Sequence, residues 1–168
     1  LDLRKSKIAA NFQIRAAVSG AIHKHLRREN FLEVQTPKII ASATEGGTSL
    51  FEMKYFDKTA YLAQSPQLYK QMLMSGGLER VYEIGPAFRA EEHNTPRHLN
   101  EFISIDIEMS FADDDVVMGV MERLVDSAAR AVAKKTEALE TLGIEPIELE
   151  LPLPRITYDE AVEMSNGK

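Results

Sequence analysis

FRAEEHNTPRHLNEFISIDIEMSF, residues 88–111, is the stretch that decides the fold of this chain. Its second part, residues 102–111, alternates apolar with polar side chains from Ile103 onward. A period of two residues predicts a β-strand whose two faces differ in polarity. The apolar face carries Ile103, Ile105, Ile107, Met109 and Phe111, and the other face carries Ser104, Asp106, Glu108 and Ser110. Residues 81–84 and 87–89 are expected to be extended as well, and the short step over 92–101 predicts antiparallel pairing.

Before this stretch, the spacing of apolar residues predicts a helix over residues 7–29, with Asn30 as its end. The apolar positions of that helix are Ile8, Phe12, Val18, Ile22 and Leu26. The further elements, in chain order, are a strand at 31–34, a loop at 42–50, strands at 51–55 and 60–63 around a turn at 57–58, and a short helix that Pro66 opens and Gly76–Gly77 ends.

After this stretch, a long helix is predicted from about Asp113 to Thr141, with acidic residues in its first turn and lysines near its end. A strand is predicted at 144–151, and Thr157 with Glu160 forms a capping box that opens another helix. This order predicts an α+β fold, in which an antiparallel β-sheet is flanked by helices and the architecture is cut short at the end of the chain.

Composition restricts the class of protein. The length of 168 residues suits one compact domain and is too short for two ordinary ones. The formal net charge of -6 excludes a polycation that coats nucleic acid nonspecifically, but not a local basic groove. There is no cysteine, which excludes disulfides, thiolate zinc sites and cysteine nucleophiles. No apolar run approaches the ~18 residues of a membrane span. Because the chain starts without methionine and stops just after a helical pattern begins, we expect it to be an excerpt.

The most unusual polar residues lie in the loop between the two predicted strands. No GxxxxGK[ST] sequence occurs, and no GxGxxG follows a strand, so a nucleotide would have to be bound by side chains on a sheet. Arg89 at a strand end offers a planar fork for a phosphate or carboxylate, and Arg97 with His98 could hold a second phosphate group. The alternative is a solvated hairpin with surface ion pairs.

Two further segments are candidates for ligand binding. Gln67 and Lys70 lie three residues apart on the short helix, so both can face one site, although a plain surface helix is the alternative. Glu45, beside Gly46 and Gly47, suits a mobile lid that presents a carboxylate to an ammonium group, although an ordinary turn is the alternative.

The segments FLEVQTPKI, ATEGGTSLF, YLAQSPQLYKQ and FRAEEHNTPRHLNEFISIDIEMSF, in this order, resemble the catalytic domain of class II aminoacyl-tRNA synthetases. Within that class they are most similar to the aspartyl-tRNA synthetases of archaeal and eukaryotic cytosolic type. The resemblance places motif 1 at about residues 15–40, with Pro37 at the dimer interface, and motif 2 at about 80–111. It makes residues 1–168 the N-terminal portion of the catalytic domain, without motif 3 and without the N-terminal OB-fold.

The resemblance also implies roles for individual residues. Arg89 would be the catalytic residue, holding the α-phosphate and the reacting carboxylate of the amino acid. The aspartate site would consist of Glu45 in a closing loop, Gln67, Lys70 and Arg89, and the ATP site of Arg89, Glu91, Arg97, His98 and Leu99. Lys70 would disfavour asparagine, because a neutral amide would leave a buried ammonium unpaired.

The implied reaction is the ATP-dependent activation of L-aspartate to aspartyl-adenylate, followed by transfer to the 3′ end of tRNA(Asp). A nondiscriminating enzyme would charge tRNA(Asn) as well. The family further implies a cytoplasmic homodimer joined through motif 1, no membrane partner, and Mg²⁺ ligands beyond this segment. We therefore expect little or no aminoacylation by residues 1–168 alone. The alternatives are a tRNA-independent synthetase paralogue that makes an amide from aspartate, and a catalytically silent binding or dimerisation module.

Overall fold

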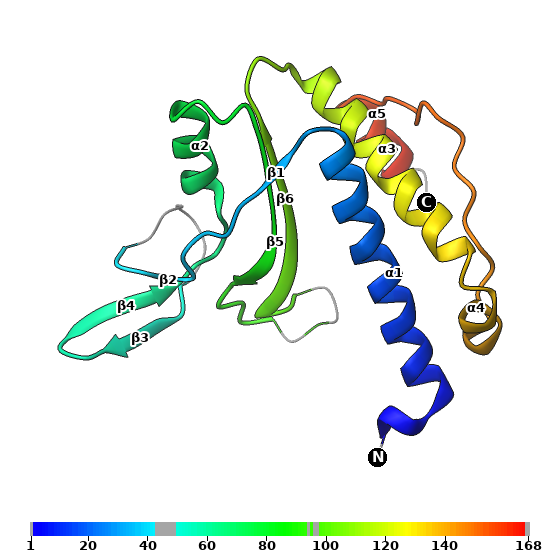
Figure 1. The fold of residues 1–168 in the computed structure, drawn as a ribbon, viewed down its shortest axis with the longest axis horizontal. Helices are drawn as coiled ribbons and strands as arrows, with labels where there is room; N and C mark the ends of the chain where they lie inside the picture. Colours follow the sequence, from blue (N-terminus) through cyan, green and yellow to red (C-terminus); the bar gives the residue numbers. More distant parts are fainter. Residues whose placement is uncertain (1, 43–49, 94, 96–97, 167–168) are drawn as a thin grey trace. The chain divides into compact units, whose positions relative to one another are not determined.

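The computed structural model describes residues 2–42, 50–93, 95 and 98–166. The chain divides into two compact units, of which one comprises residues 1–25 with 113–168 and the other comprises residues 26–112 (Figure 1). The predicted α+β class is confirmed, since the chain combines helices with sheets whose strands are mostly paired antiparallel. Within the part that the structure describes, no helix combines the length and apolar character needed to span a membrane.

The described part of residues 26–112 contains two three-stranded sheets, the helix α2 (Gln67–Ser75) and the last turn of α1 (Ser6–Arg28). The first sheet has the order β1-β5-β6 and the second the order β2-β4-β3. Its elements are β1 (Leu32–Glu33), β2 (Ile39–Ile40), β3 (Glu52–Tyr55), β4 (Lys58–Leu62), α2 (Gln67–Ser75), β5 (Arg80–Phe88) and β6 (Glu101–Met109). The predicted antiparallel step is confirmed for β5 and β6, which pair along their whole length. β1, however, runs parallel to β5, so the first sheet is mixed rather than purely antiparallel.

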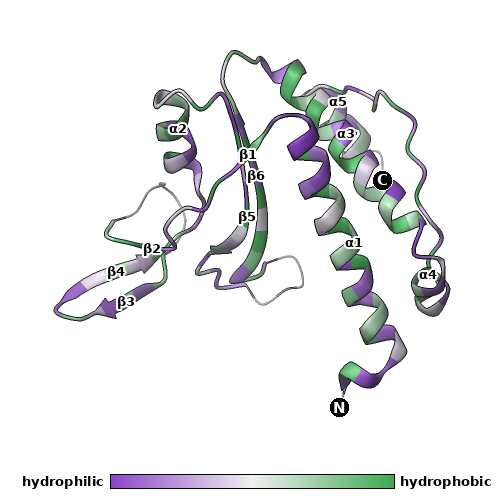
Figure 2. Ribbon diagram, viewed as in Figure 1, coloured by the Kyte–Doolittle hydropathy of each residue, from purple (hydrophilic) through white to green (hydrophobic). Residues whose placement is uncertain are grey.

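The other unit is helical. It contains η1 (Asp2–Arg4), most of α1 (Ser6–Arg28), α3 (Asp114–Ala133), α4 (Thr136–Leu142) and α5 (Tyr158–Asn166). Figure 2 shows hydrophobic and hydrophilic residues alternating along α1, as its helical spacing predicts. The helix ends where Asn30 adopts a positive φ of 62°.

Two helix starts are capped as their sequences predict. At α3, Asp113 Oδ1 accepts a hydrogen bond from the Val116 backbone N–H at 2.9 Å. At α5, Thr157 N–H donates to Glu160 Oε2 at 2.6 Å, and Glu160 N–H donates back to Thr157 Oγ1 at 3.3 Å. This capping box lowers the pKa of Glu160, mainly through the backbone N–H of Thr157.

Two predictions about the last third of the chain were wrong. The single helix expected over 113–141 is broken, because Lys135 leaves the helical conformation at φ -97° and ψ 52° between α3 and α4. The strand expected at 144–151 is not formed. Pro146 lacks the N–H that a strand ladder needs, and no other described strand pairs with this segment.

The core of the sheet unit lies around β5. Its buried apolar residues are Leu26, Phe31, Ile40, Ala60, Ala63, Val81, Tyr82 and Ala87. Tyr82 is fully buried, and its hydroxyl donates to Glu33 Oε2 on the neighbouring strand at 2.9 Å. Arg27 Nη2 donates to the same carboxylate oxygen at 2.7 Å. Burial, with the Glu33 carboxylate beside it, raises the pKa of Tyr82.

Candidate functional site

The short helix α2 (Figure 1) lies against β5 and β6. Its Lys70 is directed at side chains of β6. Lys70 is only 3% exposed, and its ammonium nitrogen lies 3.3 Å from Asp106 Oδ1 and 3.5 Å from Glu108 Oε2. It also donates to the carbonyl oxygen of Ile107 at 3.2 Å. A buried ammonium is tolerated only when such partners neutralise it and accept its hydrogen bonds. Lys70 is therefore part of a buried polar cluster on this face of the sheet and is not a surface side chain.

Gln67 joins the same cluster from the first turn of α2. Its Nε2 donates to Glu108 Oε2 at 3.2 Å. The start of the helix is held by Ser65, whose Oγ accepts the Gln67 backbone N–H at 3.0 Å, and by Pro66, whose carbonyl accepts the Lys70 N–H at 2.9 Å. The three-residue spacing thus puts Gln67 and Lys70 on the face of α2 that meets the sheet, as the sequence predicts.

The strand register places Arg89 on the same face of the sheet as this cluster. Directly opposite residues of an antiparallel pair project to the same side. The pairs on this side are Val81 with Glu108, Glu83 with Asp106, Gly85 with Ser104 and Ala87 with Phe102. Arg89 follows Ala87 by two residues, and its guanidinium carbon lies 5.3 Å from the centroid of the Phe102 ring. At roughly 3.3 Å per residue, the backbones of Glu83 and Arg89 are about 20 Å apart along the strand.

The loop between β5 and β6 carries the other candidates. Glu91 N–H donates to the Arg89 carbonyl at 2.8 Å and to Asn100 Oδ1 at 3.2 Å, which orders the start of the loop. The side chains of His98 and Thr95 are hydrogen-bonded, with a distance of 2.6 Å between His98 Nδ1 and Thr95 Oγ1. The remaining loop candidate, Leu99, is 53% exposed.

Three further predicted residues stand apart from this face or cannot be described. Glu45 and Arg97 lie outside the described residues. Pro37 is exposed and lies two residues before the start of β2. Its neighbours Thr36 and Lys38 both contact Glu83 of β5. The structure therefore brings Gln67 and Lys70 together and puts Arg89 farther along the same face of the sheet. Pro37 is connected to this face only through the residues on either side of it.

Sequence reasoning missed Asp106 and Glu108 as members of the site. Their alternation on β6 indicated that both acids share a face, but not that α2 covers that face. The two acids also change the argument about asparagine. Lys70 has carboxylate partners within the chain, so the penalty for a neutral amide is smaller than that of a bare buried ammonium.

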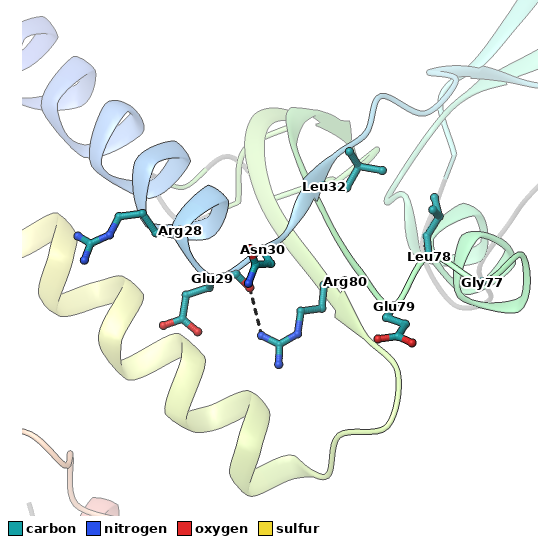
Figure 3. A pocket seen from close by; sticks show the side chains of 8 residues that line it. All are labelled: Arg28, Glu29, Asn30, Leu32, Gly77, Leu78, Glu79 and Arg80. Carbon is teal, nitrogen blue, oxygen red and sulfur yellow. Dashed lines mark hydrogen bonds between the residues drawn. The ribbon is translucent and has the colours of Figure 1, made fainter.

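A separate hollow of about 620 Å³ lies at the amino end of β5, and none of the predicted site residues lines it (Figure 3). It is lined by Arg28, Glu29, Asn30, Leu32, Gly77, Leu78, Glu79 and Arg80. Arg80 Nη1 donates to the Glu29 carbonyl at 3.2 Å, and its guanidinium carbon lies 5.6 Å from the Phe31 ring centroid. Since two arginines and two glutamates line this hollow, it has no net charge that would select an anion.

Among residues 2–42, 50–93, 95 and 98–166, no three histidine, aspartate or glutamate side chains are grouped so that they could hold a metal ion. The carboxylates of Asp106 and Glu108 are already directed at Lys70. The described residues therefore provide no Mg²⁺ site, and the expectation that the Mg²⁺ ligands lie beyond this segment stays a prediction.

Comparison with known proteins identifies the family. The family model described as tRNA synthetases class II (D, K and N) matches residues 1–168. An aspartate–tRNA(Asp/Asn) ligase of Methanocorpusculum labreanum is 60% identical over 99% of this chain and 39% of its own length. An aspartate–tRNA(Asp) ligase of Thermoplasma acidophilum is 54% identical over 98% of this chain and 39% of its own length. The chain thus spans about two fifths of the length of these curated relatives.

Solved structures agree with this assignment. Asparaginyl-tRNA synthetase from Pyrococcus horikoshii, complexed with asparaginyl-adenylate, superposes with a TM-score of 0.86 at 34% identity, covering 98% of this chain and 39% of that one. Aspartyl-tRNA synthetase from Entamoeba histolytica superposes with a TM-score of 0.79 at 37% identity, covering 99% and 32%. The chain belongs to the class II tRNA synthetases of the D, K and N group.

Proposed function

We propose that this chain is the amino-acid-binding part of an aspartate–tRNA ligase, an enzyme that activates L-aspartate with ATP and transfers it to the 3′ end of tRNA. The observation that carries the proposal is the buried Lys70, held beside Asp106 on the sheet face that also bears Arg89. The names of the relatives, which are aspartate–tRNA ligases at 54% to 60% identity, support the same choice of amino acid.

The charges of the cluster complement those of aspartate. The side-chain carboxylate of the substrate would pair with the ammonium of Lys70, and its α-ammonium would pair with the carboxylate of Asp106. Gln67 and Glu108 would hold Lys70 in place through the contacts described above. Aspartate carries two carboxylates and one ammonium. With its α-carboxylate at Arg89, each of its charges would meet an opposite charge, which limits the cost of burying them.

Arg89 would act at the reacting centre. In the first step an α-carboxylate oxygen of aspartate attacks the α-phosphorus of ATP, a new O–P bond forms, and the bond to the bridging oxygen breaks with release of pyrophosphate. Two anions approach each other in this step, so a fixed guanidinium lowers the barrier electrostatically. In the second step a ribose hydroxyl at the 3′ end of tRNA attacks the acyl carbon, loses its proton, and AMP leaves.

The remaining expected residues complete the ATP site and the closure over the amino acid. Glu91, His98 and Leu99 belong to the loop that Arg89 begins, which supports their assignment to ATP together with Arg97. Glu45 would present its carboxylate to the substrate ammonium. We assign no step to Mg²⁺, because the described residues provide no site for it.

The partners follow from the proposed reaction. We infer a cytoplasmic homodimer joined through the segment around Pro37, with tRNA(Asp) as the nucleic-acid substrate. A nondiscriminating enzyme that also uses tRNA(Asn) is the second candidate, because the relative at 60% identity is named an aspartate–tRNA(Asp/Asn) ligase.

The test is calorimetric binding of aspartate, asparagine and ATP by the full-length protein, together with Lys70→Ala and Arg89→Ala variants. We expect Lys70→Ala to lose aspartate binding and retain ATP binding, and Arg89→Ala to lose aspartate-dependent pyrophosphate exchange. If Lys70→Ala bound aspartate with unchanged affinity and unchanged preference over asparagine, the proposed pocket would be wrong.

A further inference from the structure

Glu83 is a buried carboxylate that no step of the proposed reaction uses. It lies in the middle of β5 and is 1% exposed. Its Oε1 accepts the Thr36 backbone N–H at 3.1 Å, and its Oε2 accepts the Thr36 hydroxyl at 2.7 Å. The Lys38 ammonium lies 2.7 Å from Oε1 and also donates to Thr36 Oγ1 at 3.0 Å. The charge of Glu83 is therefore both paired and hydrogen-bonded, as burial requires.

The position of Glu83 relates it to the aspartate pocket. It is directly opposite Asp106 in the β5–β6 register, so the two side chains project to the same face with β-carbons about 4.5–5.5 Å apart. Lys38 pairs with Glu83, whereas Lys70 pairs with both Asp106 and Glu108. If Lys38 were missing, Glu83 would stand unpaired beside Asp106, three carboxylates would share Lys70 alone, and they would repel one another.

The backbone next to Glu83 is adapted to this arrangement. Gly85 is the next residue on the same face, and a β-carbon there would come 3.0 Å from Glu83 Oε1. The missing side chain leaves the space that the carboxylate occupies. A larger residue would push Glu83 away from Thr36 and Lys38.

We propose that Glu83 is a positioning residue of the aspartate pocket. With Thr36 and Lys38 it ties the segment around Pro37 to the centre of β5. Because Lys38 neutralises the Glu83 carboxylate, the ammonium of Lys70 remains available to pair with Asp106 and with the substrate. This inference rests on the proposed function and adds to it a second lysine–carboxylate pair that determines aspartate affinity without touching aspartate.

The test uses the full-length protein and separates charge from shape. Lys38→Met leaves Glu83 charged and without its cation, so we expect the KM for aspartate in pyrophosphate exchange to rise about tenfold, with the KM for ATP changed less than about twofold. Combining Lys38→Met with Glu83→Gln removes both charges, so the double variant should recover an aspartate KM within about threefold of wild type. Lys38→Arg keeps the charge and should also restore the wild-type value.

Glu33→Gln is the matched control. It removes the charge of another carboxylate of this sheet, which accepts hydrogen bonds from Tyr82 and Arg27. It should lower the melting temperature and leave the aspartate KM unchanged. The inference is overturned if Lys38→Met keeps the wild-type aspartate KM, or if the double variant is no better than Lys38→Met.

These outcomes are distinguishable from failure of the proposed function. If the wild-type protein shows no aspartate-dependent exchange, the proposed function itself is wrong. If the wild type is active and Lys70→Ala is not, while Lys38→Met behaves as wild type, only the role of Glu83 is refuted.

Discussion

The ammonium of Lys70 and the carboxylate of Asp106 form an ion pair of 3.3 Å between a helix and a strand that are 36 residues apart in sequence. The lysine is 3% exposed and the aspartate side chain 19% exposed, so solvent screens this pair less than a surface ion pair. Its two charges face opposite ends of one amino acid in the proposed reaction. The pair holds α2 on the sheet, and under the proposed function it would also select the substrate.

Asp106→Asn should separate these two effects. The amide keeps the shape of the side chain but removes the charge proposed to bind the substrate α-ammonium, so the aspartate KM should rise about tenfold or more. The free energy of unfolding should fall by about 1–3 kcal/mol, because Lys70 loses one of its two carboxylates. Exchange kinetics and chemical denaturation measure the two effects. Asp57→Asn, at the exposed β3–β4 turn, is the control, and an unchanged aspartate KM in Asp106→Asn would remove Asp106 from the pocket.

Phe102→Leu should loosen Arg89. The arginine lies 5.3 Å from the Phe102 ring centroid, and such a cation–π contact at an exposed site is worth about 0.5–1 kcal/mol. If that energy holds the guanidinium for the reaction, kcat for pyrophosphate exchange should fall about two- to fivefold with little change in the aspartate KM. Ile103→Leu alters the opposite face of β6 and serves as the control. A wild-type kcat in Phe102→Leu would show that the ring does not position Arg89.

Tyr82→Phe should reduce stability and change its dependence on alkaline pH. Loss of the bond to Glu33 should cost about 1 kcal/mol. The pKa of Tyr82 is raised in the folded state, so its contribution is complete below the unfolded value near 10.0 and is lost as pH rises through the higher folded value. Urea denaturation between pH 8 and about 11.5 should therefore show a steeper alkaline decline for wild type than for Tyr82→Phe. Equal slopes would contradict this assignment.

Thr157→Ala should weaken the start of α5, more clearly at neutral pH than in acid. The pKa of Glu160 lies below its ordinary value of 4.5, mainly because the Thr157 backbone N–H stabilises the carboxylate. That contribution is present above the unfolded pKa and is lost as pH falls through the lower folded value. Removing the hydroxyl deletes the second cause of the shift, so the Glu160 pKa should move partly back towards 4.5 in an NMR titration. Amide exchange in α5 should become faster at neutral pH, whereas α3, capped by Asp113, should not change.

Local patterns in the sequence predicted most of the elements. The helix over 7–29, the short helix after Pro66, the alternation of β6 and the capping box at Thr157 each depend on contacts within a few residues. The apolar residues keep a nearly helical spacing across the break between α3 and α4, so the periodicity of the sequence could not reveal the break. The failed strand at 144–151 shows the opposite problem, since alternation without a pairing partner does not make a strand.

The candidate site was less accessible to sequence reasoning, because it depends on which elements meet. Gln67 and Lys70 could be placed on one face of α2 from their spacing alone. That this face meets Asp106 and Glu108 follows from the packing of α2 on β6, which no local pattern encodes. The parallel pairing of β1 with β5 was missed for the same reason, as was the contact of Thr36 and Lys38 with Glu83.

The strict alternation of β6 also limits how this chain can change length. Deleting one residue between Phe102 and Asp106 would turn the acids to the other side of the strand and direct isoleucines at Lys70. The connection between Phe88 and Glu101 lies outside that ladder, so an insertion there would leave the pairing intact. Insertions and deletions in the loop should therefore leave folding intact even where they impair activity, whereas those in the strand should impair folding. A folding screen of single-residue deletions across residues 89–109 would map where the ladder begins.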